Sequence, residues 1–456
     1  MKTLTANQIA EILGVSVSAG DSNAQVIGGV CSDTRTLVDG SLFIALRGEN
    51  FDGDKFAAAA FEAGAAVVVV HCWQGEVPAG KAVIEVADTL LALQKIASWW
   101  RQQLTLPVVA ITGSNGKTST KDFTAAVLAK KFNVSATRGN LNNHIGVPLS
   151  ILATTEEHTA AVWEMGMNHA GEIAPLCAIA RPKFGIITNI GTAHIEFLGS
   201  RDVIAEEKTT LAKALPEDGA LFIAATCDYH DYMRDRTRAA LVPVGNGRGL
   251  VRAEEIQFGG EGSRFNLVIG EEDCRSCPVE LQVPGRHMVT NALLAAAVGW
   301  KLGISCEDIA AALSEARLTG GRLQRYESKG VTVIDDTYNA NPESMAAAID
   351  TLADTPVVNG ARRFAVLGMM GELGSHGPAA HRRTGELAVA RKLRLVAVGK
   401  GAEEIAGGGD GAPYFSDYEE AANWLAAEVK PGDVVLFKGS RSAAVERVMN
   451  CAFPRN

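Results

Sequence analysis

Continuous apolar runs alternate with helix-patterned segments through the middle of this 456-residue chain. Four of these runs, each bounded by helical patterns, read as buried strands: LPVVAITG, AAVWEMG, FGIITNIG and GALFIAA. Fully apolar strands of this kind are typical of a parallel sheet covered on both faces. Ligands bind such sheets at the carboxyl ends of the strands. The pattern therefore predicts an α/β fold with its site at that edge.

The pattern changes towards both ends of the chain. Up to about residue 84, short strand-like runs surround a helical segment near KFAAAAFEAGA, and the amphipathic helix DTLLALQKIASWWRQQL follows. Beyond ARLTGGRLQR the strand runs restart with VTVIDD, RFAVLGMMGELG, RLVAVGKG and GDVVLFKGSR. We therefore predict a small α/β unit at the start and a separate α/β domain from about residue 317.

Composition and charge argue against several classes of protein. Asp and Glu number 52 against 43 Lys and Arg, and the net charge of −9 gives no general attraction for nucleic acid or anionic membranes. No run approaches the roughly 18 apolar residues of a spanning helix, and MKTLTANQIAEILG reads as a short amphipathic helix, not a signal peptide. Cys274 and Cys277 form a lone C-x-x-C in a charged loop, which lacks a zinc ribbon's second pair. We expect free thiols and a cytosolic protein.

A glycine-rich stretch, ITGSNGKTST, joins the first strand run to a helical pattern. The usual phosphate loop is G-x-x-x-x-G-K-[ST], but here the earlier glycine is Gly113, two residues closer to Gly116. Backbone amides at such a loop and at the helix start attract anions. A plain turn is the alternative. The strand–loop–helix context favours a nucleotide, with Lys117 near the β- and γ-phosphates and Thr118 towards Mg²⁺.

Three later side chains are candidates for the same site. Glu164 ends a predicted strand, where a carboxylate suits Mg²⁺, although a solvated glutamate is the simpler interpretation. His194 follows the next strand end, and a lone loop histidine is usually structural or exposed. Lys208 shares a predicted helix face with Ile204 and Leu211. A lysine there is costly unless it is paired, modified or snorkelling to solvent.

Two polar segments lie in the last third of the chain. DDTYNANPES, residues 335–344, follows a strand run and suits ribose or base recognition as well as an ordinary turn. FKGSRSAAVERV places Lys438 and Arg441 around a Gly-Ser turn that opens a helix, which is a natural anion site. A helix cap at Ser440 or Ser442 is the alternative there.

Together these motifs resemble the Mur ligases of bacterial cell-wall synthesis, over nearly the whole chain. The matching segments are SDTR with GSLFIALRGENFDGDKF, TGSNGKTST, GNLNNHIGVPLS, WEMGMNHAGEI, TNIGTAHIEFLGS, AEEK, GRHMVTNALLAAAVG, GGRLQ, DDTYNANPESM and KGSR. The resemblance implies an N-terminal UDP-sugar-binding domain (1–84), a central ATPase domain (85–316) with a phosphate loop on a mostly parallel sheet, and a C-terminal Rossmann-like domain (317–456). The short phosphate loop is the form that this family uses.

The resemblance also implies roles for individual residues. The ATP contacts would be Gly113, Ser114, Asn115, Gly116, Lys117, Thr118, Ser119, Asn291, Arg322, Asp336 and Asn339, with His287 a weaker candidate. The contacts to the UDP-linked substrate would be Ser32, Asp33, Thr34, Arg35 and Arg47, with Gly48 nearby, and Asn140, Asn142 and Asn143. Two Mg²⁺ ions would be held by Thr118, Glu164, His194 and a carbamylated Lys208. The catalytic set would be Lys117, Glu164, His194 and Lys208.

The implied activity is ATP-dependent joining of D-alanyl-D-alanine to UDP-N-acetylmuramoyl-tripeptide through an acyl phosphate, by a cytoplasmic monomer. The YNANP segment resembles the family member with that substrate. Another Mur-type amide ligase or a folylpolyglutamate synthase-like enzyme is the alternative, and SDTR…ALRG counts against the synthase. A GTPase-type switch is disfavoured because the sequence has no Asn-Lys pair. His144 and Met369 depart from the family pattern, which often has acidic residues there.

Overall fold

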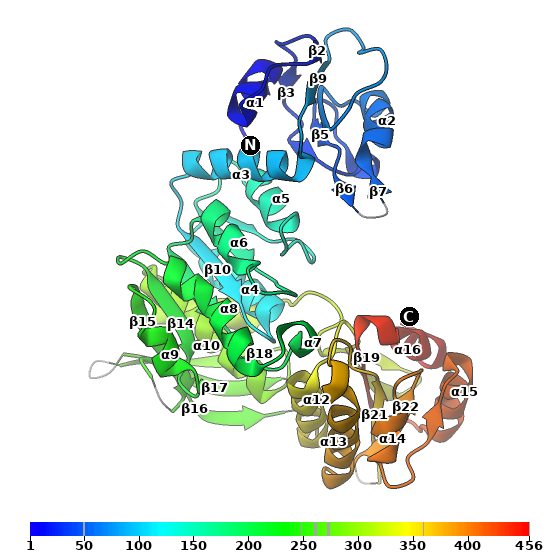
Figure 1. The fold of residues 1–456 in the computed structure, drawn as a ribbon. Helices are drawn as coiled ribbons and strands as arrows, with labels where there is room; N and C mark the ends of the chain where they lie inside the picture. Colours follow the sequence, from blue (N-terminus) through cyan, green and yellow to red (C-terminus); the bar gives the residue numbers. More distant parts are fainter. Residues whose placement is uncertain (49–50, 248, 260–261, 271–273, 359, 456) are drawn as a thin grey trace.

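The computed structural model describes residues 1–456 except 49–50, 248, 260–261, 271–273, 359 and 456. Three sheet-centred parts follow one another along the chain, coloured blue, cyan to green and yellow to red in Figure 1. The α/β class is thus confirmed, as is the mostly parallel central sheet. The exact domain boundaries at 84 and 316 stay predictions.

The N-terminal part is built on a five-stranded sheet with strand order β2-β9-β8-β5-β4. All four valines of β8 are buried, as their continuous apolar run predicts. The strands are β1 (Leu4–Thr5), β2 (Ala19–Gly20), β3 (Gln25–Val26), β4 (Val30–Cys31), β5 (Leu42–Ile44), β6 (Arg47–Gly48), β7 (Phe51–Asp52), β8 (Val67–Val70) and β9 (Ala82–Glu85). The helices are α1 (Ala6–Leu13), α2 (Ala57–Glu62) and two 3₁₀ turns, η1 (Thr34–Thr36) and η2 (Gly53–Phe56).

Helix α3 (Thr89–Gln103) joins the first part to the second. Asp88 caps its start, and one face of the helix, which includes Ile96 and Trp100, is buried. The helix packs against α1 on one side and against α5 and α6 on the other. Trp100 Nε1 also donates a hydrogen bond of 2.7 Å to the carbonyl of Thr154. The two parts consequently share one continuous apolar core.

The central sheet has nine strands in the order β11-β12-β10-β13-β14-β15-β16-β17-β18. Strands β11 to β16 run parallel, and β17 and β18 continue the sheet antiparallel. The four predicted strands are confirmed as β10 (Val108–Thr112), β12 (Ala160–Glu164), β13 (Phe184–Ile187) and β14 (Ala220–Ala224). The other strands are β11 (Val134–Ala136), β15 (Ala240–Asn246), β16 (Val251–Phe258), β17 (Ser263–Ile269) and β18 (Arg275–Leu281).

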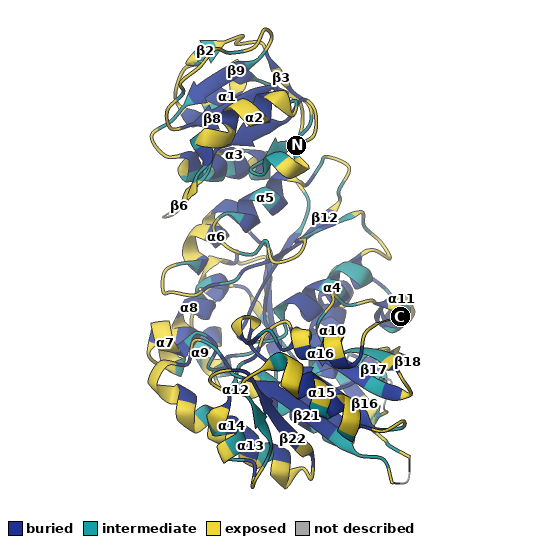
Figure 2. Ribbon diagram, turned by 90° about the vertical axis from the view of Figure 1, so that its right-hand side faces the viewer, coloured by how far each residue is buried: buried dark blue, intermediate teal, exposed yellow. Residues whose placement is uncertain are grey.

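Helices cover both faces of this sheet, as Figure 2 shows. On one side α4 packs against α10, and α11 packs against β18. On the other side α6 packs against α8, which lies on β13 and β10. The helices are α4 (Lys117–Leu128), α5 (Gly146–Leu152), α6 (Ile173–Ala180), α7 (Ile195–Leu198), α8 (Arg201–Ala214), α9 (His230–Arg234), α10 (Arg286–Lys301) and α11 (Cys306–Glu315).

The C-terminal part has a six-stranded sheet with the order β19-β20-β24-β21-β22-β23, parallel except at β19. The strands are β19 (Gln324–Ser328), β20 (Val331–Asp336), β21 (Arg363–Gly368), β22 (Arg394–Val398), β23 (Tyr414–Phe415) and β24 (Val434–Lys438). The helices are α12 (Pro342–Asp354), η3 (Gly374–His376), α13 (Gly377–Ala390), α14 (Glu403–Gly407), α15 (Tyr418–Glu428), η4 (Arg441–Ala443) and α16 (Glu446–Ala452). The four predicted strands are confirmed, and the edge strands β19 and β23 were not predicted.

The C-x-x-C pair is not contained in a loop. Cys277 lies inside β18 with its side chain buried, whereas Cys274 precedes the strand and is exposed. Residues 271–273, before the pair, lie outside the described residues. The two thiols sit in different environments, which agrees with the prediction of an incidental pair. None of the helices in the described ranges is long and apolar enough to cross a membrane.

Candidate active site

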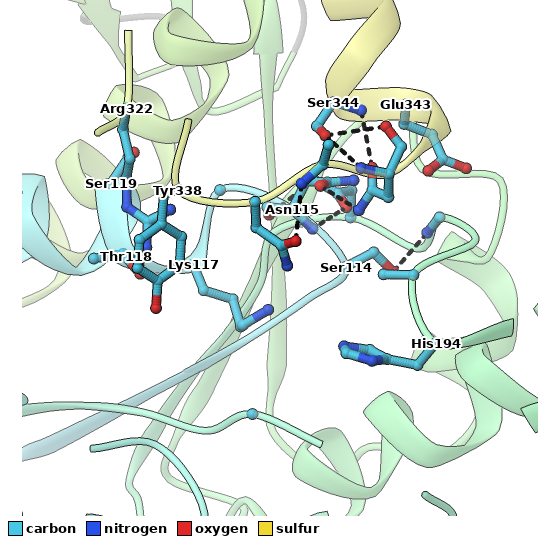
Figure 3. A pocket seen from close by; sticks show the side chains of 18 of the residues that line it. Ser114, Asn115, Lys117, Thr118, Ser119, His194, Arg322, Tyr338, Glu343 and Ser344 are labelled. Atoms are coloured by element: carbon cyan, nitrogen blue, oxygen red, sulfur yellow. Dashed lines mark hydrogen bonds between the residues drawn. The ribbon is translucent and has the colours of Figure 1, made fainter. Parts of the chain in front are cut away.

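A cavity of about 940 Å³ lies between the central and C-terminal parts. Its walls come from residues that follow the carboxyl ends of β10, β12 and β13 in one sheet and of β20 and β24 in the other. Figure 3 shows side chains from both parts around it. The predicted edge of the sheet therefore does hold the candidate site.

The glycine-rich loop between β10 and α4 forms one wall of this cavity. Gly116 has φ +77° at the start of α4, a left-handed conformation that favours glycine. A Cβ there would lie 2.8 Å from the amide atoms of Asn291, which is buried on α10. Both the positive φ and the close approach of Asn291 therefore favour glycine at this position. Asn291 packs directly against the loop.

Side chains from neighbouring strands hold the loop in place. The Asn115 N–H donates to Asn189 Oδ1 at 2.9 Å, and the Thr188 hydroxyl donates to the Asn115 carbonyl. Ser114 Oγ accepts from the N–H of Gly191 at 2.8 Å. From the C-terminal part, Asn341 Nδ2 donates to Asn115 Oδ1 at 2.7 Å (Figure 3). The loop is therefore fixed before any ligand binds.

Lys117 and Arg322 bring positive charge to this loop. Lys117 Nζ donates to the Gly113 carbonyl at 2.8 Å, and Arg322 Nη2 donates to Thr118 Oγ1 at 2.9 Å. Arg322 also stacks on Tyr338, with its guanidinium 4.1 Å from the ring centroid. Burial lowers the pKa of Lys117, Glu164 opposes this shift, and Arg322 adds to it. An anionic ligand would relieve this crowding of cations.

Glu164 ends β12 and is 2% exposed. Its Oε2 accepts from the Thr118 hydroxyl at 2.8 Å, and its Oε1 accepts from Asn142 Nδ2 at 2.7 Å. The structure thus excludes the solvated strand-end glutamate and brings a carboxylate against the phosphate-loop hydroxyl. A carboxylate and a hydroxyl side by side are the oxygen donors that Mg²⁺ prefers.

His194 lies in the cavity wall, at the start of α7. Its Nδ1 is 2.5 Å from Oε2 of Glu372, a residue of the C-terminal part. The two groups are in close contact, although Nδ1 does not meet the geometry of a regular hydrogen bond. The imidazole lowers the pKa of the Glu372 carboxyl from its usual value. Figure 3 shows the ring directed into the space that Lys117 faces.

Lys208 is 1% exposed on α8, between Ile204 and Leu211, which are both fully buried. The snorkelling alternative is therefore wrong, because the side chain stays in the interior. Burial lowers its pKa well below the usual value, Lys117 lowers it further, and Glu207 opposes the shift. Lys208 is not among the described residues that line the cavity, but it is close enough to Lys117 to feel its charge.

The nucleotide-side candidates of the C-terminal part meet at the ends of β20 and β24. Lys438 Nζ donates to Asp336 Oδ2 at 2.6 Å and to the Asn339 carbonyl at 3.0 Å. His287 lines the cavity beside this pair, and burial lowers its pKa to about 4. Arg441 also lines the cavity, and it is largely exposed and paired with a glutamate on α16.

Three protein-family models match the chain in succession. The Mur ligase family catalytic domain matches residues 26–101, the Mur ligase middle domain 111–299, and the Mur ligase glutamate ligase domain 321–441. A UDP-N-acetylmuramoyl-tripeptide–D-alanyl-D-alanine ligase from Synechocystis is 39% identical over 94% of this chain and 93% of its own length.

The chain belongs to the Mur ligase family. It is therefore an ATP-dependent amide ligase.

Solved structures agree with this assignment. MurF from Acinetobacter baumannii superposes with a TM-score of 0.88 at 32% identity, covering 100% of both chains. MurF ligase from Thermotoga maritima, solved in complex with ADP, superposes with a TM-score of 0.82 at 28% identity, covering 93% of this chain and 96% of its own.

In this Mur ligase the predicted substrate contacts of the N-terminal part do not line the cavity. Ser32, Asp33, Thr34, Arg35 and Arg47 lie on the N-terminal part, around β4, η1 and β6. Asp33 pairs with exposed Arg35 at 2.6 Å, and Arg47 pairs with Asp52 at 3.1 Å. The predicted substrate contacts therefore form two separate clusters, one on the N-terminal part and one at the cavity.

The loop before α5 belongs to the cavity instead. Asn140, Asn142 and Asn143 all line it. Asn142 bonds to Glu164, and Asn143 Oδ1 accepts from two backbone amides at the start of α5. This loop lies between the phosphate loop and α5, and α5 packs on α3.

The two departures from the family pattern lie outside the described cavity wall. His144 is exposed, and its carbonyl accepts from Gln94 Nε2 on α3 at 3.1 Å. Met369 is half-buried and packs against a core cluster of the C-terminal part that includes Phe364 and Phe437. Neither side chain forms a hydrogen bond or ion pair with the phosphate loop in the described part of the chain.

Several lining residues were not predicted: Asn189, Tyr338, Asn341, Glu343 and Glu372. Tyr338, Asn341 and Glu343 stand within DDTYNANPES, and Asn189 stands within TNIGTAHIEFLGS, so these motifs carry a sequence signal for them. Glu372 stands in a Gly-flanked turn after β21 and had no spacing signal.

Proposed function

We propose that this chain joins the amine of D-alanyl-D-alanine to the terminal carboxylate of UDP-N-acetylmuramoyl-tripeptide, with conversion of ATP to ADP and phosphate, in the cytoplasm. The observation that carries the proposal is the cavity, where a phosphate loop, a buried carboxylate and cations from two parts of the chain face one space. The names of the relatives, at 33–39% identity, support the choice of substrates.

The chemistry proceeds in two balanced steps. A carboxylate oxygen of the tripeptide attacks the γ-phosphorus, the bond to the bridging oxygen of ADP breaks, and an acyl phosphate forms. The amine then attacks the acyl carbon, the carbon–oxygen bond to phosphate breaks, and the amine loses a proton. Phosphoryl transfer of this kind depends on positioning and charge neutralisation. Lys117 and Arg322 supply positive charge where the phosphates would lie.

The site also needs to exclude water, because water hydrolyses an acyl phosphate. Arg322 and Asn341 reach from the C-terminal part to Thr118 and Asn115 of the phosphate loop. These contacts support a closed arrangement in which both parts cover the reacting groups. The protein therefore contributes orientation and enclosure more than covalent chemistry.

We propose that Thr118, Glu164 and His194 hold Mg²⁺. Within the described ranges no three His, Cys, Asp or Glu side chains form a metal-holding group. Mg²⁺ commonly binds through one or two carboxylates together with water and substrate phosphates. When bound, Mg²⁺ would neutralise charge on the ATP phosphates. The Thr118 hydroxyl and the Glu164 carboxylate are the adjacent donors.

We further propose that Lys208 is carbamylated. Burial favours its neutral amine, which is the form that reacts with carbon dioxide. The carbamate would be an anion beside Lys117 and would remove the conflict between two buried cations. We also propose that Ser32, Asp33, Thr34, Arg35 and Arg47 contact the UDP moiety, while Asn140, Asn142 and Asn143 contact the peptide end.

Phosphate release tests the proposal. ATP, UDP-N-acetylmuramoyl-tripeptide and D-alanyl-D-alanine are supplied together and with each acceptor omitted in turn. We expect sustained release only with both acceptors, and a product whose mass is that of the two acceptors less one water. Release that needs neither acceptor would contradict the ligase activity. Equal rates with a single amino acid in place of D-alanyl-D-alanine would favour another Mur-type ligase.

A further inference from the structure

One close contact between the central and C-terminal parts involves a residue that the proposed mechanism does not use. His194 follows β13, and Glu372 lies in the turn between β21 and η3. Their side chains meet with Nδ1 and Oε2 2.5 Å apart, and both residues line the cavity. The histidine side chain is 18% exposed and the glutamate 43%. Partial shielding from water makes such a contact stronger than an exposed surface pair.

The backbone at both residues is in an unusual conformation. His194 has φ +65° and Glu372 has φ +58°, in the left-handed region that non-glycine residues rarely adopt. Such conformations persist where surrounding contacts determine them, and they cluster at functional sites. Here the N–H of Glu196 donates to the Glu372 carbonyl at 3.2 Å, and Gly374 packs closely on the Glu196 side chain. Both turns are therefore shaped for contact with each other.

The contact with Glu372 determines which ring nitrogen of His194 is available to a ligand. Because Nδ1 faces Glu372, Nε2 is the nitrogen left to face a ligand. The ring points into the space that Lys117 faces (Figure 3). A histidine that acts on a ligand commonly has its other nitrogen held by a carboxylate. The geometry has that arrangement, but the carboxylate comes from a different part of the chain.

We propose that Glu372 is a positioning residue: it fixes the ring of His194 at the phosphate end of the cavity, and does so only while the C-terminal part is docked. Docking of that part and assembly of the site would then be one event. This inference rests on the ligase activity proposed above and adds a residue to it.

The first test compares variants of Glu372. Glu372→Gln keeps the length of the side chain but replaces its carboxylate by a neutral amide, which weakens the contact with His194 Nδ1. We expect kcat to fall about ten- to a hundredfold, with the KM for the UDP-linked substrate within about twofold. Glu372→Asp keeps the charge and should retain more activity than the Gln variant. The matched control is Glu404→Gln, which loses an ion pair with Arg382 in the same part, outside the described cavity wall.

The second test asks whether Glu372 acts through His194. Glu372→Gln should cost little further activity in a His194→Ala background, because a positioning residue has nothing left to position. If the two losses multiply, Glu372 acts independently of His194 and the proposal is overturned. An unchanged kcat in Glu372→Gln, or more activity in the Gln than in the Asp variant, would also overturn it.

Hydrogen exchange supplies a readout without turnover. The Glu196 amide should exchange at least about fivefold faster in Glu372→Gln than in the wild type, with Glu404→Gln unchanged. Equal protection in all three proteins would contradict docking through Glu372. Failure of the proposed function is recognised separately, because the wild type would then lack acceptor-dependent phosphate release while the exchange comparison still stands.

Discussion

At the scale of single residues, the interior of this Mur ligase holds two neighbouring lysines with lowered pKa values. Lys117 follows the phosphate loop at the start of α4, and Lys208 is buried on α8. Each side chain loses hydration on burial, and the charge of Lys117 further disfavours the charged form of Lys208. Two such cations are retained only where an anion compensates for them, and ATP phosphates and a carbamate are the two anions that we propose.

A substitution at Lys208 tests the carbamate. Lys208→Met replaces a buried amine with an apolar chain of similar length, so we expect the protein to fold with at least wild-type thermal stability. Ligase turnover should fall by about a hundredfold or more, because the proposed anion is lost. Lys213→Met, an exposed lysine on the same helix, is the control and should remain active. Full turnover in Lys208→Met would disprove the carbamate role.

His287 predicts a pH dependence of stability. Its pKa in the folded protein is about 4, below its ordinary value of 6.5, because burial disfavours the charged ring. A depressed pKa means that the neutral ring contributes stability above pH 6.5, which is lost as pH falls towards 4. We expect the denaturant midpoint to decrease over this window. His287→Gln should show a smaller decrease; an identical pH profile would show that His287 is not responsible.

At the scale of elements, the turn from β10 into α4 determines how the phosphate loop is formed. We predict that Gly116→Ala lowers affinity for ATP at least about tenfold, since the added Cβ would strain the backbone and collide with Asn291. Gly14→Ala is a matched control: Gly14 has the same φ of +77°, but no atom lies within 4 Å of the added Cβ. Nucleotide titration and thermal unfolding measure both variants.

The expected pattern is a larger loss of stability in Gly116→Ala than in Gly14→Ala, and a loss of ATP affinity in Gly116→Ala alone. Equal ATP affinities would mean that loop geometry at Gly116 does not determine nucleotide binding. The comparison separates the general cost of a left-handed alanine from the specific contact with Asn291.

The strands and helices that the sequence predicted are those whose apolar residues form a continuous run or recur at helical spacing. Continuous apolar runs identified the parallel strands, and i, i+4 spacing identified Ile204 and Lys208 on one helix face. Strands β16 to β18 alternate polar and apolar residues and extend the sheet antiparallel, and β19 is a polar edge strand. Their pairing is decided by neighbouring strands, and local pattern alone does not determine it.

The site was predictable to the extent that its residues follow strands. Lys117, Glu164 and His194 were identified from strand ends or a motif, and the structure brings them into one cavity wall. Glu372 was missed because its partner is distant in sequence, and only the docking of two sheets brings them together. Single-sequence patterns do not contain that docking.

At the scale of the whole molecule, one apolar core runs through all three parts. The polar contacts that cross from the C-terminal part to the phosphate loop are few and include the bond from Asn341 to Asn115. Asn341 also caps α12 through its Oδ1, which accepts from Ser344 N. A substitution that keeps the cap can therefore isolate the contact between the parts.

Asn341→Asp is that substitution, because aspartate caps helices as well as asparagine does but has no amide to donate. We expect a loss of about 1 kcal/mol in nucleotide binding, about fivefold in affinity, with little change in thermal stability. Asp417→Asn at the start of α15 is a control cap that does not reach the phosphate loop. Unchanged nucleotide affinity in Asn341→Asp would mean that this contact does not stabilise the bound arrangement.

The position of the cavity between two parts has a consequence for measured affinities. A ligand that touches both walls binds fully only to molecules in which the walls are together, so its apparent dissociation constant is the intrinsic one divided by the fraction of such molecules. If one molecule in ten were closed, every bridging ligand would appear about tenfold weaker. A first substrate that draws the walls together would remove this penalty for the second. Ordered, cooperative binding would then follow from architecture alone, without a separate regulatory site.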